Sequence, residues 1–379
     1  MTENLGNLLF MYGAQNIFKD ATGSDMQSLT VTRQPECQLI IYPCANQINP
    51  AVRSLSYNKK FFESQKTPFI LLGLGTQINQ PADFAEIDIS PLIHSLHSST
   101  IDYLKYVAIN GKGIGVRGPW SQFMFKAITG IEPKITTCPS LFANRAPSSA
   151  LAGLLESRYN GLKSGKKMLN RIAVHPQHGS AYQSEYHKAS ERFLWNLAKT
   201  TNGALYVVNG PSSFFSLARN RLFEKMHYAN YRSLCAFLEP EIPYDEVLGT
   251  LIQNSIAFPG VLGWLDWLST CDLCIGKRIH GAIAAMQAGC PAVLITHDSR
   301  TKELASQASV PSITISDLEE IVSVCHSGDA LHHILERIEF DSSDWIAKRE
   351  SARHATIDMI CSNGFSDLLD DNFINPSER

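Results

Sequence analysis

A strand–helix–strand segment in the second half of the chain most constrains the fold. A short apolar strand runs from Cys271 into Gly276, a helical pattern extends from about Gly281 to Gly289, and a second apolar run, 291–295, follows at once. This order is typical of a parallel sheet, because parallel neighbours need a crossover connection between them. We therefore expect an α/β protein in which the first strand ends beside the start of a helix.

Three polar groups lie at this junction. Lys277, Arg278 and His280 lie within four consecutive positions between the strand and the helix. Open parallel sheets bind ligands just beyond the carboxyl ends of their strands, and a helix N-terminus favours anions. Two cations and an imidazole here predict a site for a phosphorylated or carboxylated small molecule. The alternative is a set of surface charges with a structural histidine, but charges beside an apolar helix need a compensating partner.

The composition excludes several other classes of protein. A chain of 379 residues predicts two domains, and 44% hydrophobic with 18% charged residues is ordinary for a soluble globular enzyme. The net charge of −3 gives no reason to expect a nucleic-acid partner. The sequence contains no run of 18 apolar residues, so we expect no transmembrane helix. Peripheral membrane contact remains compatible with the sequence. The first four residues lack the order of a signal peptide.

The cysteine pattern predicts reduced thiols. Nine scattered cysteines, an odd number, fit a cytoplasmic protein better than a disulfide framework. Cys271 and Cys274 form one CxxC pair without the second pair that a zinc site would need, so we expect them to be packing residues. His175 and His178 form another possible metal pair, again without a third ligand nearby. We predict no metal site.

Helical and strand patterns alternate along both halves of the chain. Apolar runs of four to six residues bounded by Gly and Pro predict buried parallel strands. Residues 146–168 lack a strand pattern and are predicted to contain the domain junction. We expect two Rossmann-like domains with parallel sheets facing a central cleft: an N-terminal domain over 1–160, a C-terminal domain over 165–345, and a helix and tail over 346–379. The strands are predicted at 38–42, 68–72, 113–117, 171–175, 204–208, 271–276, 291–295 and 312–315.

Other polar residues are candidates for ligand contacts. Arg117 ends one predicted strand and Arg300 follows another, and a guanidinium at such a place can form a forked contact with a phosphate or carboxylate. Either could instead face solvent. Asn4 and Asn7 could cap the first helix or hold sugar hydroxyls, and Asp298 is a good helix cap. No GxSxG, HExxH or P-loop pattern is present.

Several of these residues are similar to the signature of a known family. The run 277–281 (Lys-Arg-Ile-His-Gly), a helix ending in 288–291 (Ala-Gly-Cys-Pro), a strand, and then 298–300 (Asp-Ser-Arg) resemble the polysaccharide pyruvyl transferase family. The Arg-x-His-Gly element is the specific part of this likeness. Further landmarks occur in the same order as in the family: Asn4-Leu5-Gly6-Asn7, Gly73-Leu74-Gly75, Val116-Arg117 and Cys138-Pro139-Ser140.

The resemblance implies a fold similar to GT-B glycosyltransferases and transfer of the enolpyruvyl unit of phosphoenolpyruvate to sugar hydroxyls. The acceptor would be a polysaccharide, such as a capsule or exopolysaccharide, or its lipid-linked precursor. His280 would be the catalytic residue, and Arg278, Arg117 and Arg300 would bind the donor. Family members often carry Lys where this chain has Arg300, and usually a strand ahead of the Asn-x-Gly element, which only three residues precede here.

The sequence therefore predicts a phosphoenolpyruvate-dependent pyruvyl transferase that forms a pyruvate ketal. The N-terminal domain would bind the acceptor and the C-terminal domain the donor. Lys277, Asn4 and Asn7 complete the predicted substrate-binding residues, and no cofactor is expected. Two alternatives remain: a GT-B glycosyltransferase that uses a nucleotide sugar, and a non-catalytic protein of the same fold in a polysaccharide pathway.

Overall fold

The computed structural model describes residues 5–21, 37–52, 54–78, 88–165, 169–177, 188–200, 205–207, 218, 228–325 and 327–376. The chain divides into two compact units, each assembled from three segments. Unit 1 comprises Met1–Leu9, Ser149–His297 and Ser309–Trp345, and unit 2 comprises Phe10–Ser148, Asp298–Ala308 and Ile346–Arg379. Each unit is built around its own sheet.

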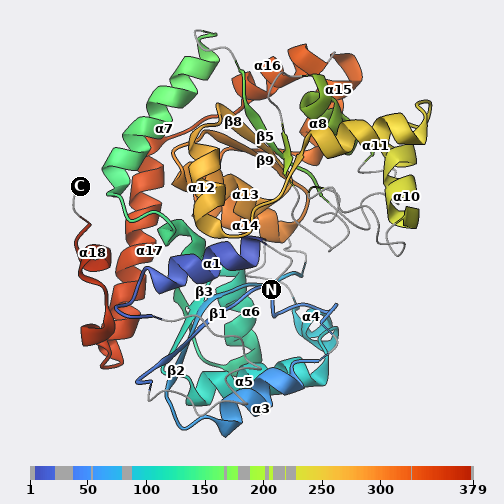
Figure 1. Cartoon of the computed structure of the whole chain (residues 1–379). Helices are drawn as coiled ribbons and strands as arrows, with labels where there is room; N and C mark the ends of the chain where they lie inside the picture. The colour runs from blue at the N-terminus through green and yellow to red at the C-terminus, as the bar shows by residue number, and fades with distance from the viewer. Residues whose placement is uncertain are drawn as a thin grey trace. The chain divides into compact units, whose positions relative to one another are not determined.

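Unit 2 contains a parallel sheet with strands in sequential order, β1 (Ile40–Pro43), β2 (Phe69–Leu74), β3 (Gly113–Val116) and β4 (Lys134–Ile135). Every residue of β2 is buried, as expected for a central strand covered on both faces. Figure 1 shows α3 (Ser56–Ser64) and α5 (Ser98–Asn110) together below these strands. Their aromatic side chains form the core, where the Phe62 ring centroid is 4.3 Å from that of Phe69 and 6.3 Å from that of Tyr103.

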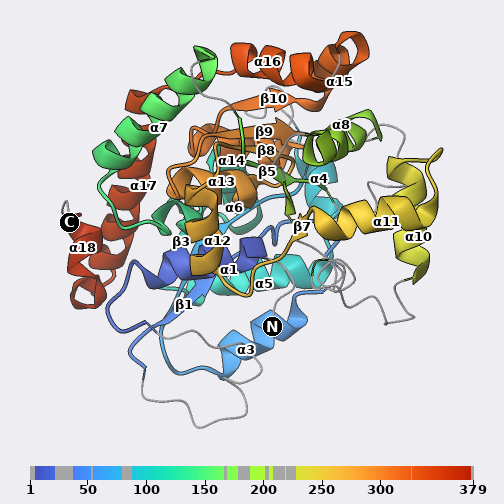
Figure 2. The same cartoon turned by 45° about the horizontal axis from the view of Figure 1, so that its top comes forward.

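Unit 1 contains a parallel sheet of six strands in the order β10-β9-β8-β5-β6-β7. Figure 2 shows β10, β9, β8 and β5 in succession. The strand order reverses between β5 and β8, because β6 and β7 extend from one side and β8, β9 and β10 from the other. Such a topological switch point is where open parallel sheets bind ligands. The strands are β5 (Ile172–His175), β6 (Leu205–Val207), β7 (Ser255–Ile256), β8 (Leu273–Gly276), β9 (Ala292–Thr296) and β10 (Ser312–Thr314).

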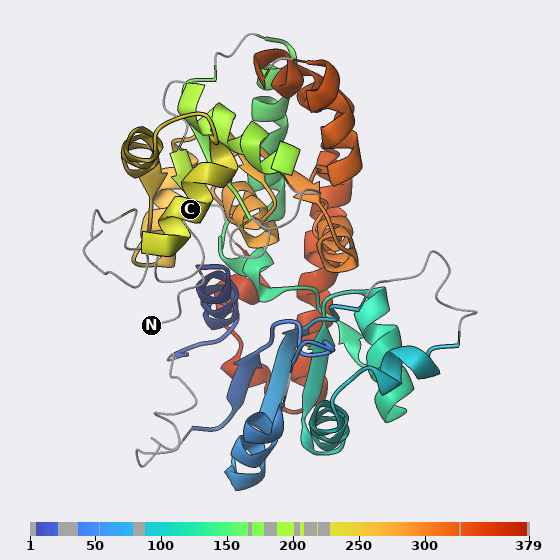
Figure 3. The ribbon, with the colours of Figure 1, turned by 90° about the vertical axis from the view of Figure 1, so that its right-hand side faces the viewer.

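Helices surround both sheets, and Figure 3 shows the two units from the side. Unit 2 also includes most of α1 (Leu5–Gln15), and α4 (Ser90–His94), α6 (Pro119–Thr129), η1 (Pro139–Phe142), α14 (Ser299–Gln307), most of α17 (Ser342–Ser362), η5 (Ser366–Leu368) and α18 (Asp371–Ile374). Unit 1 includes α7 (Ser148–Lys163), α8 (Lys188–Thr200), α10 (Tyr228–Leu238), α11 (Tyr244–Gln253), α12 (Val261–Ser269), α13 (Ile279–Gln287), α15 (Ile315–Val324) and α16 (Ser327–Arg337). None of the described helices is long and apolar enough to cross a membrane.

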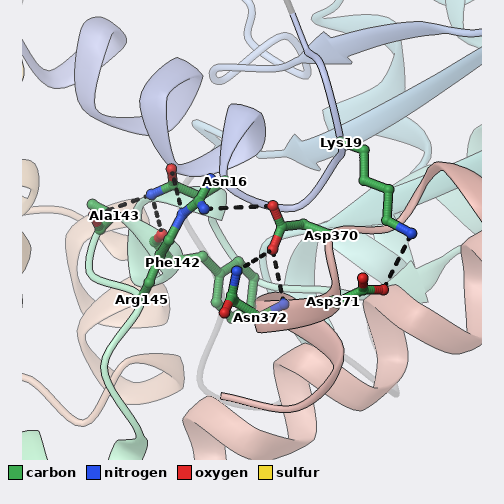
Figure 4. Close-up of polar contacts among 8 residues, drawn as sticks. All are labelled: Asn16, Lys19, Phe142, Ala143, Arg145, Asp370, Asp371 and Asn372. Carbon is green, nitrogen blue, oxygen red and sulfur yellow. Dashed lines mark hydrogen bonds and ion pairs between the residues drawn. The ribbon is translucent and has the colours of Figure 1, made fainter. Parts of the chain in front are cut away.

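The end of the chain is an integral part of unit 2. Asn16, just after α1, donates from Nδ2 to the carbonyl oxygens of Phe142 (2.9 Å) and Ala143 (3.2 Å), and its Oδ1 accepts from Arg145 Nε. Arg145 in turn pairs with Asp370 at 3.4 Å, as Figure 4 shows. In the same view Asp370 caps α18, and Lys19 pairs with Asp371 at 3.1 Å. Segments from both ends of the chain therefore close one hydrogen-bond network.

The predicted α/β class with two parallel sheets is confirmed, and each predicted strand has a counterpart among the described strands. The short strands β4 and β7 were not predicted. The unit boundary falls at Ser148, inside the stretch 146–168, and most of the rest of that stretch forms α7. A helix rich in Ala and Leu accounts for the lack of a strand pattern. The contacts also assign α14 and most of α17 to unit 2. The predicted ranges 1–160, 165–345 and 346–379 are continuous, whereas each unit combines three separate segments of the chain. The assignment of acceptor and donor binding to these ranges stays a prediction.

All nine cysteines lie in the described part of the chain and are free thiols. Cys271 and Cys274 are buried, as predicted for packing residues. Cys37 and Cys361 are exposed.

Candidate functional site

The junction between β8 and α13 has the geometry that the sequence predicted. Arg278 precedes the helix in an extended conformation, and its carbonyl oxygen accepts from the backbone N–H groups of Gly281 (2.8 Å) and Ala282 (3.1 Å). The helix therefore begins at Ile279, two residues earlier than expected. Arg278 and His280 are half-buried, whereas Ile279 is buried in the core. Two polar side chains thus stand at the first turn of a helix at the carboxyl end of a central strand.

Lys277 is bound inside unit 1. Its Nζ lies 3.0 Å from Oε1 of Glu191 on α8, and both side chains are fully buried. The same Oε1 accepts from the backbone N–H of Gln177 at 3.1 Å. Burial lowers the pKa of Lys277 and raises the pKa of Glu191, and the opposite charge of each partner counteracts these shifts. The pair fastens the end of β8 to α8, and a role for Lys277 in substrate binding stays a prediction.

Glu191 was missed in the sequence. A signal for it exists, because the amphipathic helix α8 carries this carboxylate beside its apolar residues Phe193 and Leu194. A charge in such a position requires a buried partner. The sequence does not show which cation that partner is, since the two residues meet only when β8 and α8 pack together.

Arg117 ends β3, as predicted, but its guanidinium is held by unit 2 itself. Nε donates to the carbonyl oxygen of Gly73 (2.8 Å), Nη1 to Oδ1 of Asn46 (2.8 Å), and Nη2 to the carbonyl oxygen of Cys44 (3.2 Å). Only 2% of the residue is exposed. A Cβ at position 75 would lie 2.8 Å from Arg117 Cδ, so glycine is needed there to admit the side chain. These contacts tie three strand ends together, and donor binding by Arg117 stays a prediction.

Arg300 belongs to the unit of Arg117 and not to that of Arg278. It lies on α14, and its Nη2 is 3.2 Å from Oδ2 of Asp298. Asp298 caps this helix through Oδ1, which accepts from Thr301 N at 2.7 Å, so the predicted cap is confirmed. Both side chains of the ion pair are about one-quarter exposed, 26% and 24%. Donor binding by Arg300 stays a prediction.

Glu303, also on α14, connects that helix to α6. Its carboxylate accepts from Ser121 N (3.0 Å) and from Ser121 Oγ (2.9 Å) in the first turn of α6. Burial raises the pKa of Glu303, and the hydrogen bonds from Ser121 oppose this. A carboxylate is well suited to the N-terminal end of a helix. Because α6 lies in unit 2, this contact explains why α14 is also part of unit 2.

Of the two asparagines, only Asn7 lies among the described residues. Asn7 lies in the first turn of α1 and is half-buried. Asn4 lies outside the described residues, as does His178 of the possible metal pair. Lys277, Arg278 and His280 belong to unit 1, whereas Arg117 and Arg300 belong to unit 2. An anion-binding site is best supported at the β8–α13 junction, where a cation, an imidazole and a helix start coincide.

Comparisons with known proteins identify the family of the chain. The family model described as polysaccharide pyruvyl transferase matches residues 4–299. No curated protein sequence matches the chain. The solved structures that match include an alpha,alpha-trehalose-phosphate synthase (UDP-forming) from Burkholderia vietnamiensis, with 12% identity over 90% of this chain and 72% of that chain, and a TM-score of 0.39. An alpha,alpha-trehalose 6-phosphate synthase from Burkholderia multivorans has 12% identity over 96% and 78%, also with a TM-score of 0.39.

Proposed function

Because the chain belongs to the polysaccharide pyruvyl transferase family, we propose that it transfers the enolpyruvyl unit of phosphoenolpyruvate to hydroxyl groups of a saccharide. The acceptor is a sugar of a polysaccharide or of its lipid-linked precursor, and the product is a pyruvate ketal. The proposal includes a cytoplasmic location and no cofactor besides the donor substrate. The observation that supports it most is the presence of Arg278 and His280 together, half-buried, at the start of α13.

The donor has the chemistry that this junction can bind. Phosphoenolpyruvate carries a phosphate and a carboxylate, and both form charge-assisted hydrogen bonds with a guanidinium. The helix N-terminus contributes further N–H donors and a favourable dipole. Arg278 would therefore hold the donor, and His280, two residues later, would face its reacting carbons.

The reaction balances with one proton-transferring residue. An acceptor hydroxyl forms a bond to C2 of the donor while C3, the methylene carbon, gains a proton and becomes a methyl group. The bond between C2 and the phosphate oxygen breaks, and a second hydroxyl replaces the phosphate to close the ketal. Of the two protons that the hydroxyls lose, one ends on C3 and the other leaves with phosphate. An imidazole such as His280 can deliver and accept these protons near neutral pH.

The test is incubation of the purified protein with phosphoenolpyruvate and a panel of saccharide acceptors. We expect phosphate release that depends on one acceptor, and mass spectrometry should detect a pyruvyl ketal on that acceptor. Calorimetric titrations with phosphoenolpyruvate and with uridine diphosphate distinguish the main alternative. Tight binding of uridine diphosphate without binding of phosphoenolpyruvate would replace the proposal with a glycosyltransferase.

A further inference from the structure

A second histidine lies at the switch point of the unit 1 sheet. His175 is the last residue of β5 and pairs with Gly276, the last residue of β8. Its carbonyl oxygen accepts from the backbone N–H of Lys277 at 2.8 Å. His175 therefore adjoins the segment that carries Arg278 and His280, at the place where the strand order of the sheet reverses.

The segment 276–281 is shaped around this residue. A Cβ at position 281 would lie 2.5 Å from Nδ1 of the His175 ring, and a Cβ at position 276 would lie 2.1 Å from its carbonyl oxygen. Both positions are glycine, which allows the backbone to approach the histidine from two sides. The ring also lies near Trp264, with ring centroids 5.7 Å apart.

The imidazole is polar and buried, and it forms no hydrogen bond with any of the residues that the structure describes. Only 1% of His175 is exposed, and neither Nδ1 nor Nε2 has a hydrogen-bond partner among the described residues. Burial, together with the charge of Arg278, lowers the pKa of His175 to about 3, so the ring is neutral at physiological pH. A buried polar group without a partner destabilises the folded state unless another molecule satisfies it.

An apolar ring at this position would fill the same space without the free-energy cost of burying two nitrogens that form no hydrogen bond. We propose that His175 is a third ligand-contacting residue of the β8–α13 site, where its neutral imidazole forms a hydrogen bond with the anion that Arg278 binds. The inference rests on the proposed function for the identity of that anion. Arg278 comes two residues after Gly276, the strand partner of His175, so an anion held by Arg278 would lie near the His175 ring. A neutral donor adds direction to the site without adding charge.

Two substitutions separate hydrogen bonding from packing. His175→Phe keeps an aromatic ring but removes both nitrogens, and His175→Gln keeps an N–H donor near the position of Nε2. We expect His175→Phe to weaken binding of phosphoenolpyruvate by about 10- to 100-fold, the range for a hydrogen bond to a charged group, without lowering the thermal midpoint. His175→Gln should stay within about threefold of the wild-type protein. His354→Phe, at an exposed site on α17, is the matched control and should leave binding unchanged.

Nitrogen NMR with ¹⁵N-labelled histidine tests the contact in the full-length wild-type protein itself. The spectrum of His175→Gln identifies the His175 signals. We expect those signals to show a neutral ring and to shift when phosphoenolpyruvate is added, and inorganic phosphate and pyruvate would show which half of the donor is responsible.

The outcomes distinguish the two proposals. If the wild type binds phosphoenolpyruvate but His175→Phe binds it equally well, or the His175 signals do not respond, the inference is wrong and the proposed function stands. If the wild type binds uridine diphosphate instead and the His175 signals respond to it, the proposed function is wrong and the contact is retained. If no anion binds, both are wrong.

Discussion

His280 is the residue on which the proposed chemistry depends. It lies half-buried in the first turn of α13, so its side chain contributes little to the core. We expect His280→Ala to lower kcat by roughly 10²- to 10⁴-fold, the usual contribution of a general acid–base group, with a nearly unchanged thermal midpoint. Steady-state kinetics with saturating donor measures this. His354→Ala, at an exposed position, is the control. A variant of His280 that keeps more than a third of the wild-type kcat would exclude the catalytic assignment.

His175 should make the stability of the protein depend on pH. Its folded-state pKa of about 3 lies below the value of 6.5 for an unperturbed histidine. Between these values the unfolded chain binds more protons, so the free energy of unfolding falls as the pH is lowered. From pH 7 to pH 5 we expect the wild type to lose about 2 kcal/mol more than His175→Gln, measured by urea denaturation at each pH. Parallel pH profiles for the two proteins would contradict this.

At the scale of elements, α17 carries a buried arginine that forms hydrogen bonds with the segment 141–148 of unit 2. Arg349 donates to the carbonyl oxygens of Leu141, Asn144 and Ala146 and to Oγ of Ser148, at distances between 2.6 and 3.1 Å. Arg349→Ala would leave these buried acceptors without donors, so we expect a loss of roughly 3 kcal/mol or more in the free energy of unfolding. Chemical denaturation measures it. Arg337→Ala, on the exposed face of α16, should change stability by less than about 0.5 kcal/mol. Equal effects of the two substitutions would show that the Arg349 contacts contribute nothing.

At the scale of the whole molecule, neither unit is a continuous piece of chain. Unit 2 takes α14 and most of α17 from sequence beyond the segment that forms its sheet. A chain ended at Trp345 would lose Arg349, the ion pair between Lys134 and Asp358, and the packing of Met359 at Gly113. We expect hydrogen exchange to show lost protection in β1, β2 and β3, while β5, β8 and β9 of unit 1 stay protected. Unchanged protection in β2 of the truncated chain would contradict this.

The sequence alone determined most of the strands, β4 and β7 excepted, and the place of the strand–helix junction at 277–280. Apolar runs such as 69–74 and 273–276 are bounded by residues that end strands, and both the strand identity and the strand–helix junction at 277–280 depend on neighbours in the chain. The family resemblance rested on the same local motif, and the match over residues 4–299 confirms it. The cap at Asp298 was likewise predictable, because a helix cap involves residues only three apart.

Tertiary structure decided what each charged side chain contacts. Lys277 and Arg117 look alike in the sequence as cations at strand ends, yet the fold gives one a carboxylate from α8 and the other the carbonyl oxygens of two neighbouring strands. It also made α14, which carries Arg300, part of unit 2 and set His175 against Gly281. These contacts join residues far apart in the chain, and they form only after strand pairing and helix packing have brought those residues together. No local pattern encodes such a partner, because the free energy that selects it comes from burial and hydrogen bonding in the assembled core.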